Sequence, residues 1–227
     1  GRGECVPYSR YGETVDSVRQ AIEAMRTDIE NGLDRAGLQD ALPAGAARCA
    51  LDCAFWDLEA KTTGTPVWKL AGLPEPKPLE TAVTIVLDEV DAMAEAARTA
   101  PSSLLKLKLG GANDMDRVRA VHEARPDARL ILDGNEALDA AVFPEIVRAA
   151  AKLGVVLIEQ PFPAGKDDYL LRRPAEVSVC ADESAHTRDQ IQDLVRAYDV
   201  VNVKLDKSGG LTEALAMVRE AKAAGMG

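Results

Sequence analysis

Charged side chains recur at regular intervals from residue 108 onward, each at the end of a short apolar run. The run 104–108 ends in Lys108, and later runs end in Asp133, Glu159, Asp182 and Lys204. Successive members are 25, 26, 23 and 22 residues apart, which is about the length of one strand, one helix and their connections. We therefore expect one charged residue at the carboxyl end of each of five successive β-strands.

Three of these residues are carboxylates on strands that would be neighbours. Asp133, Glu159 and Asp182 would bring three negative charges to one place. Hard oxygen ligands with no His or Cys nearby suit Mg²⁺, with Mn²⁺ as the alternative, and leave octahedral positions for water or substrate. A lone Asp more often pairs with a lysine or caps a helix, but three at successive strand ends favour the metal. We predict one Mg²⁺ per subunit at these residues.

The two lysines suggest proton transfer. Lys108 and Lys204 end the second and sixth predicted strands, which are opposite walls if the sheet closes into an eight-stranded barrel. A lysine that removes a proton must be neutral, and Lys106, on the same strand face as Lys108, would lower its proton affinity together with the metal. The metal would stabilise the enolate of a carbon acid next to a carboxylate. Two opposed bases imply inversion at that carbon, and Asp206, on the predicted strand face of Lys204, could orient it.

The elements that must position these residues fall into two parts, divided by the proline-rich segment 70–78. Before it, helices are predicted from the N-cap Thr14 to about Glu30 and from Ala46 to about Thr62. After it, six strands alternate with six helices. The predicted strands are 79–87, 104–109 and runs ending at 133, 159, 182 and 204, and the predicted helices are 88–99, 114–125, 139–152, 166–172, 187–197 and 211–224. We therefore divide the chain into domains 1–76 and 77–227.

Near-continuous apolar strands that alternate with amphipathic helices indicate a parallel sheet covered by helices. A doubly wound open sheet and an eight-fold barrel both carry polar residues at strand ends. An open sheet concentrates its site at one switch point, whereas five consecutive polar strand ends favour the barrel. A complete barrel takes about 250 residues. Six units therefore predict part of a barrel, and we expect the sequence to be a fragment of a longer protein.

The composition argues against several classes of partner. The 227 residues are 47% hydrophobic and 28% charged, which is typical of a globular protein. A net charge of -10 disfavours nucleic acid and anionic membranes. The sequence has no apolar run of the roughly 20 residues that span a bilayer, and nothing at its start resembles a signal peptide, so we expect a cytoplasmic protein. The four cysteines show no C-x-x-C pattern and are expected to be reduced.

A glycine pair, Gly209 and Gly210, precedes the last predicted helix. Such a pair can cradle a phosphate at a helix N-terminus. Because the sequence there has neither the G-x-G-x-x-G spacing nor a P-loop lysine, a tight turn is the favoured interpretation.

Five motifs, in this order, resemble those of the enolase superfamily in its muconate-lactonizing subgroup. They are Lys106-Leu107-Lys108, Asp133-Gly134-Asn135, Ile158-Glu159-Gln160-Pro161, Ala181-Asp182-Glu183-Ser184 and Asn202-Val203-Lys204-Leu205-Asp206-Lys207-Ser208-Gly209-Gly210-Leu211. The helix over 50–58 resembles the end of that family's capping domain. The resemblance implies an α/β fold: a (β/α) barrel of the enolase superfamily, six of whose β/α units are present, preceded by part of an α+β capping domain.

Within the subgroup, the run 202–211 and the strand around Thr84 most resemble the dipeptide epimerases. The resemblance implies an isomerase that epimerises an Ala-Glu-like dipeptide at the carbon α to the carboxylate, by two-base 1,1-proton transfer with Mg²⁺. The residue roles it implies are acid/base catalysis for Lys108 and Lys204, metal binding for Asp133, Glu159 and Asp182, substrate binding for Lys106 and Thr84, and support for Asn135 and Asp206. The family's Asp-x-Asp for the substrate ammonium group has no counterpart within these residues.

Other functions stay open. The same enolate would serve N-acylamino acid racemisation, o-succinylbenzoate synthesis or muconate cycloisomerisation, and a catalytically inactive paralogue would bind Mg²⁺ without proton exchange. In each enzymatic case the partner is a small molecule, either a dipeptide or an N-acylamino acid, and the protein could form a homo-oligomer.

Overall fold

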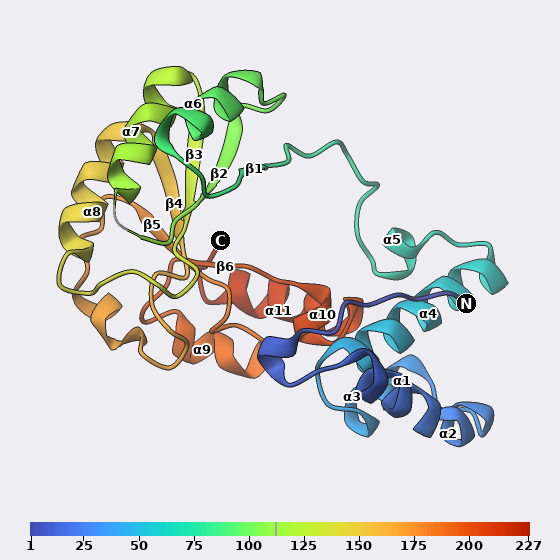
Figure 1. Cartoon of the computed structure of the whole chain (residues 1–227). Helices are drawn as coiled ribbons and strands as arrows, with labels where there is room; N and C mark the ends of the chain where they lie inside the picture. The colour runs from blue at the N-terminus through green and yellow to red at the C-terminus, as the bar shows by residue number, and fades with distance from the viewer. Residues whose placement is uncertain (112) are drawn as a thin grey trace. The chain divides into compact units, whose positions relative to one another are not determined.

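The computed structural model describes residues 1–111 and 113–227, which fold into two compact units. The first unit comprises residues 1–77, 186–191 and 203–225, and the second comprises 78–185, 192–202 and 226–227 (Figure 1). The segment that carries Lys204 therefore belongs to the same unit as the N-terminal helices.

The second unit is built on a six-stranded parallel sheet whose strands lie in chain order. They are β1 (Val83–Ile85), β2 (Leu104–Lys108), β3 (Arg129–Asp133), β4 (Val155–Glu159), β5 (Ser178–Ala181) and β6 (Val200–Val201). This confirms the six predicted strands. The predictions for the first and last strands were too long, since β1 covers three residues and β6 ends before Lys204. Within the described residues these two strands pair on one side only, so fewer hydrogen bonds hold their ends.

Helices α6 (Val90–Thr99), α7 (Asp114–Ala124) and α8 (Phe143–Ala150) all lie along one face of the sheet (Figure 1). Adjacent helices contact each other, α6 with α7 and α7 with α8. Alternate strand residues, Leu105 and Leu107 of β2 and Leu130 and Leu132 of β3, are fully buried. A doubly wound sheet carries helices on both faces, so this arrangement favours the barrel.

Three predicted helices of the second half differ from the structure. Residues 167–172 form the 3-10 helix η3 (Asp167–Arg172), and the predicted helix over 187–197 is reduced to η4 (Arg188–Gln190) and α9 (Ile191–Leu194). The helix predicted from 139 begins at Phe143, with Pro144 in its first turn, and ends in η2 (Ala151–Leu153). Segments this short form few helical hydrogen bonds, so tertiary contacts decide their conformation.

Helix α4 (Ala46–Thr63) is the centre of the first unit, because most of the other helices of this unit pack on it. Those in contact with it are α1 (Val15–Ala24), α3 (Arg35–Ala41), α5 (Val67–Leu70), α10 (Leu205–Ser208) and α11 (Leu211–Ala223). The small side chains of Ala46 and Ala47 are buried with Val18 of α1. Small residues let neighbouring helices approach closely, which explains why α4 can serve several partners.

Thr14 caps α1, as predicted. Its Oγ1 accepts a hydrogen bond from the Ser17 amide at 3.1 Å, and Ser17 Oγ accepts one from the Thr14 amide at 2.9 Å. The single helix predicted to reach Glu30 is instead divided at Met25 into α1 and α2 (Arg26–Glu30). The 3-10 turn η1 (Ser9–Tyr11) precedes them.

The cysteines are free, in agreement with the prediction. In the part of the chain that the structure describes, no helix has both the length and the apolar character needed to cross a membrane.

Candidate active site

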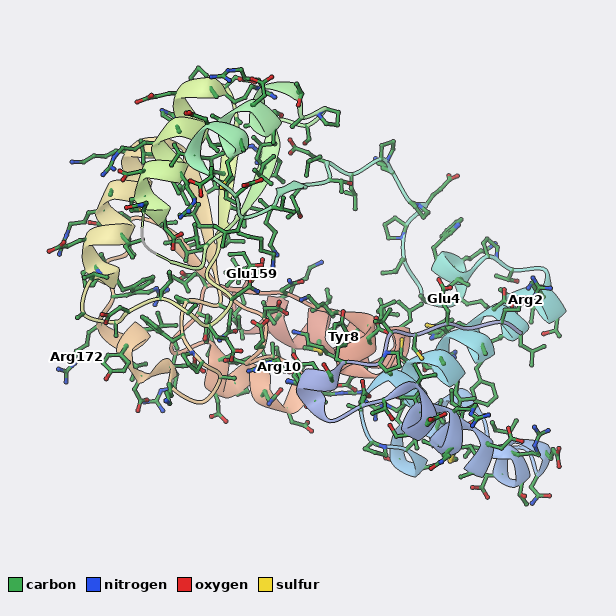
Figure 2. All side chains as sticks on the ribbon, in the orientation of Figure 1. Arg2, Glu4, Tyr8, Arg10, Glu159 and Arg172 are labelled. Carbon is green, nitrogen blue, oxygen red and sulfur yellow. The ribbon has the colours of Figure 1, made fainter. Side chains whose placement is uncertain are left out.

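The register of the sheet brings the predicted site residues into line. Lys108 of β2 is paired with Asp133 of β3, which is paired with Glu159 of β4, and Thr84 of β1 is paired with Lys106. Residues in register on parallel strands point to the same face of the sheet. Their face alternates with that of the buried leucines, and Figure 2 shows Glu159 at the strand ends on the side away from α6 and α7.

Asp133 is 1% exposed and accepts hydrogen bonds from both lysines. Its Oδ2 lies 2.7 Å from Lys108 Nζ and 2.9 Å from Lys106 Nζ, while its Oδ1 accepts the Asn135 amide at 3.1 Å. Lys108 Nζ also donates to Asn135 Oδ1 at 2.9 Å, so Asn135, which was predicted to support the site, contacts the Lys108 amine. Burial alone would raise the pKa of Asp133, but the two lysines outweigh it and lower that pKa.

The pKa of Glu159 is shifted in the opposite direction to that of Asp133, because it is raised. Its Oε2 lies 2.7 Å from Lys106 Nζ, and its Oε1 accepts a hydrogen bond from Asn202 Nδ2 at 3.0 Å. Burial raises the pKa of Glu159, and the negative charges of Asp133 and Asp182 raise it further, against the opposing effect of Lys106. Glu159 is therefore close enough to Asp133 and to Asp182 to be repelled by both.

Lys106 is the cation shared by two of these carboxylates. Its side chain is 19% exposed. Burial would lower the pKa of Lys106, but hydrogen bonds to Glu159 and Asp133 prevail and raise it. The structure therefore gives Lys106 the role of a counter-charge, alongside its predicted part in holding substrate.

The carboxylate set suits a hard divalent cation. Asp133, Glu159 and Asp182 are each at most 4% exposed, and buried carboxylates require positive charge close by. Among the described residues, no three His, Cys, Asp or Glu side chains form a ready-made metal cluster, and the Lys106 ammonium lies between two of the predicted ligands. An all-oxygen donor set that is balanced by an ammonium group fits Mg²⁺.

Two site residues were missed by the sequence analysis. Asn202 was quoted within a motif but given no role, and it donates to Glu159. Gln160 is fully buried, has a positive φ of 34°, and accepts hydrogen bonds from the amides of Asp182 (2.8 Å) and Ser184 (3.1 Å). Gln160 thus fixes the backbone that carries Asp182. A glutamine directly after a strand-end carboxylate was the available signal.

Asp182 and Lys204 both lie beyond the strands that were predicted to end at them. Asp182 follows β5 by one residue, and Lys204 is the N-cap of α10 in the first unit. The predicted strand face shared by Lys204 and Asp206 is therefore wrong, because residues 205–208 are helical. The Asp206 carboxylate accepts a hydrogen bond from the Val6 amide at 2.8 Å instead.

A parallel β/α sheet with its charged residues at the strand ends, opposite the helices, defines the class of β/α-barrel enzymes. Comparison with family models makes this specific. The model for enolase C-terminal domain-like proteins matches residues 88–227, and the model for the mandelate racemase / muconate lactonizing enzyme N-terminal domain matches residues 1–72. The chain therefore belongs to the mandelate racemase / muconate lactonizing enzyme family of the enolase superfamily, and its fold is six β/α units of that family's barrel preceded by part of its capping domain.

Curated relatives are similar along the whole chain. The chain is 46% identical over 228 residues to L-Ala-D/L-Glu epimerase of Escherichia coli (strain K12), covering 99% of this chain and 71% of that protein. It is 40% identical over 228 residues to N-acetyl-D-glutamate racemase of a Pseudoalteromonas species, covering 99% and 72%.

Solved structures of enolase family members are also similar to this chain over nearly its whole length. An enolase family member from Agrobacterium tumefaciens with homology to dipeptide epimerases, with bound sodium and L-Ala-L-Glu, is 48% identical with a TM-score of 0.94, covering 99% of this chain and 69% of that one. Dipeptide epimerase from Enterococcus faecalis V583, complexed with Mg and L-Leu-L-Tyr, is 29% identical with a TM-score of 0.90, covering 99% and 68%.

Proposed function

We propose that this protein is a dipeptide epimerase that inverts the carbon α to the carboxylate of an Ala-Glu-like dipeptide. The observation that carries the proposal is the alignment of Lys106, Lys108, Asp133 and Glu159 on one face of the sheet at the strand ends. The similarity to proteins named epimerases and racemases, which are isomerases, supports this class of enzyme. The N-acylated glutamate shared by the substrates in those two names supports the substrate class.

We assign the proton transfers to Lys108 and Lys204. In one direction the neutral amine of one lysine takes the α-proton, and the ammonium group of the other delivers a proton to the opposite face of the same carbon. In the reverse direction the two lysines exchange roles. Each turnover leaves one amine and one ammonium group, so the proton count balances.

The remaining roles concern binding. Asp133, Glu159 and Asp182 would hold Mg²⁺, an assignment supported by the Mg-bound epimerase of Enterococcus faecalis. When bound, this cation would supply positive charge against the substrate carboxylate and so acidify the neighbouring C–H group. Lys106 and Thr84, which are in register on adjacent strands, would hold the substrate.

Racemisation of an N-acylamino acid is the second candidate, favoured by the 40% identity to N-acetyl-D-glutamate racemase. L-Ala-L-Glu and N-acetyl-glutamate both present an acylated amine next to the reacting carbon. They differ in the free ammonium group, which only the dipeptide carries. The preferred substrate therefore depends on whether the protein holds that ammonium group.

The test is to incubate the protein and Mg²⁺ with L-Ala-L-Glu, and in parallel with N-acetyl-L-glutamate, and to quantify the D-glutamyl product by chiral chromatography. We expect L-Ala-D-Glu to form with the larger kcat/KM, and we expect its formation to cease in EDTA. A larger kcat/KM for N-acetyl-glutamate would establish the second candidate, and no conversion of either compound would contradict both.

A further inference from the structure

Two buried residues of α4, Arg48 and Asp52, bond the backbone at the corner between α10 and α11, residues 208–212. We call this pair of residues the clamp. We infer that Arg48 and Asp52 position Lys204, the proposed acid/base residue at the start of α10, so that helix α4 controls the geometry of one proton transfer. This inference rests on the proposed function of Lys204. All the contacts that carry it lie within the first unit.

Arg48 connects three backbone carbonyl groups. It is 6% exposed, and its Nη2 donates to the Ser208 carbonyl at 2.7 Å, while Nη1 donates to the carbonyls of Gln39 (3.1 Å) and Leu42 (3.2 Å). Burial lowers the pKa of Arg48, against the opposing charges of Glu213 and Asp52. A buried guanidinium is an expensive way to stabilise a fold, so its value here is the fixed direction of its hydrogen bonds.

Asp52 completes the clamp from the next turn of the same helix. It is fully buried, its Oδ2 accepts the Thr212 amide at 2.9 Å, and its Oδ1 accepts Gln39 Nε2 at 3.0 Å. Trp56 Nε1 donates to Thr212 Oγ1 at 3.0 Å. Because an amide in the first turn of α11 already has a carboxylate partner, the structure favours the tight-turn interpretation of the glycine pair over a phosphate cradle.

The glycine pair lets α4 come this close. Gly209 and Gly210 have φ values of 83° and 114°. A Cβ atom on Gly209 would lie 2.3 Å from Arg48 Nε, and one on Gly210 would lie 2.5 Å from Asp52 Cβ. The corner therefore needs glycine both for its backbone conformation and for the contact with α4.

The clamp is one hydrogen bond away from Lys204. The Ser208 amide donates to the Lys204 carbonyl at 3.0 Å, and the carbonyl of the same Ser208 accepts Arg48. Helix α10 is only four residues long, so a shift of its clamped end moves its first turn. The Val6 amide holds Asp206 of that helix from another direction. Arg48 therefore acts through Ser208 on the backbone that carries the Lys204 amine.

The test uses the separate exchange of the α-proton from each diastereomer. Arg48→Met and the milder Asp52→Asn are compared with the native protein in D₂O with Mg²⁺, and deuterium incorporation into L-Ala-L-Glu and L-Ala-D-Glu is followed by NMR. Lys204→Ala identifies the diastereomer whose proton Lys204 removes. We expect both variants to slow exchange of that diastereomer about tenfold or more, and to change exchange of the other by less than about threefold.

Val18→Ala is the control for general destabilisation, because Val18 packs on α4 within the same unit through a different set of contacts. It should affect both exchanges equally. Equal slowing of both exchanges in Arg48→Met and Asp52→Asn, or no slowing in either variant, would overturn the inference and leave the clamp a purely structural role. If Arg48→Met does not fold, Asp52→Asn decides alone, since it removes a charge without changing size. A native protein that exchanges neither diastereomer would instead refute the proposed function.

Discussion

Lys106 supplies positive charge to two buried carboxylates at once. Its ammonium group lies within hydrogen-bond distance of Asp133 and Glu159, which are among the most deeply buried charges of the sheet. From the sequence, Lys106 was expected to lower the proton affinity of its neighbour Lys108. The structure shows a different and additional effect, because the raised pKa of Lys106 keeps a positive charge among the carboxylates.

Glu213 is the residue for which the structure predicts a pH effect. Its carboxylate is nearly buried and accepts hydrogen bonds from the Arg188 side chain, at 2.9 Å from Nε, and from the Arg188 amide at 2.7 Å. Burial would raise the pKa of Glu213, but Arg188 outweighs it and lowers that pKa. A lowered pKa in the folded state adds stability above the unfolded-state value of about 4.3, and this stability is lost as the pH falls through the folded-state pKa.

We therefore expect Glu213→Gln to reduce the free energy of unfolding by about 1–2 kcal/mol at pH 7. The difference from the native protein should shrink as the pH falls below about 4. Urea unfolding of both proteins at pH 7 and at a pH below about 4 measures this difference in the free energy of unfolding. Glu145→Gln removes an exposed carboxylate and should have little effect at either pH. A deficit for Glu213→Gln that stays constant down to acidic pH would contradict the assignment.

At the scale of elements, the ends of β3 and β4 were predictable and short helices were not. A strand-end carboxylate after an apolar run, such as Glu159, leaves a periodic signal in the sequence. Helix α10 leaves none, because its four residues follow an apolar run without a cap or stripe of their own. Its last residue, Ser208, accepts a hydrogen bond from Arg48, which is 160 positions away in the sequence. A local sequence pattern carries no information about contacts between residues so far apart. Lys204 was therefore predicted to end a strand, whereas it is the N-cap of α10.

The α10–α11 corner gives a prediction with a matched control. Gly209→Ala should reduce the free energy of unfolding by about 1–2 kcal/mol for the left-handed conformation, plus about 1–3 kcal/mol for the collision with Arg48. Gly225 has a similar φ of 79°, but a Cβ atom there would meet nothing within 4 Å. Gly225→Ala should therefore show the first contribution alone. Chemical denaturation of both variants measures the difference, and equal losses would refute the close contact.

At the scale of the whole molecule, the sequence predicted the parallel β/α architecture because each strand and helix repeats the same apolar pattern. It also placed Asp133 and Glu159 at the ends of their strands, where the structure has them, and Asp182 one residue too early, since β5 ends at Ala181. It did not predict the role of Gln160, whose side chain accepts hydrogen bonds from the Asp182 and Ser184 amides in the loop after β5. It also did not predict which helix holds the segment that carries Lys204, since tertiary packing alone decides that.

Binding of Mg²⁺ should stabilise the folded protein. At about a hundred times its dissociation constant, a ligand that binds only the folded state adds about 2.7 kcal/mol to the free energy of unfolding. We expect the melting temperature to rise with added MgCl₂ and to return on addition of EDTA. In Asp182→Asn the rise should require much higher Mg²⁺ concentrations. An equal response in the variant and the native protein would exclude Asp182 as a ligand.

The most direct test of the central claim is the exchange of the α-proton with solvent deuterium in single lysine variants. We expect Lys108→Ala to abolish exchange from one diastereomer of Ala-Glu and to leave exchange from the other, and Lys204→Ala to do the reverse. Loss of both exchanges in each variant, or retention of both in either one, would contradict the division of labour between two bases.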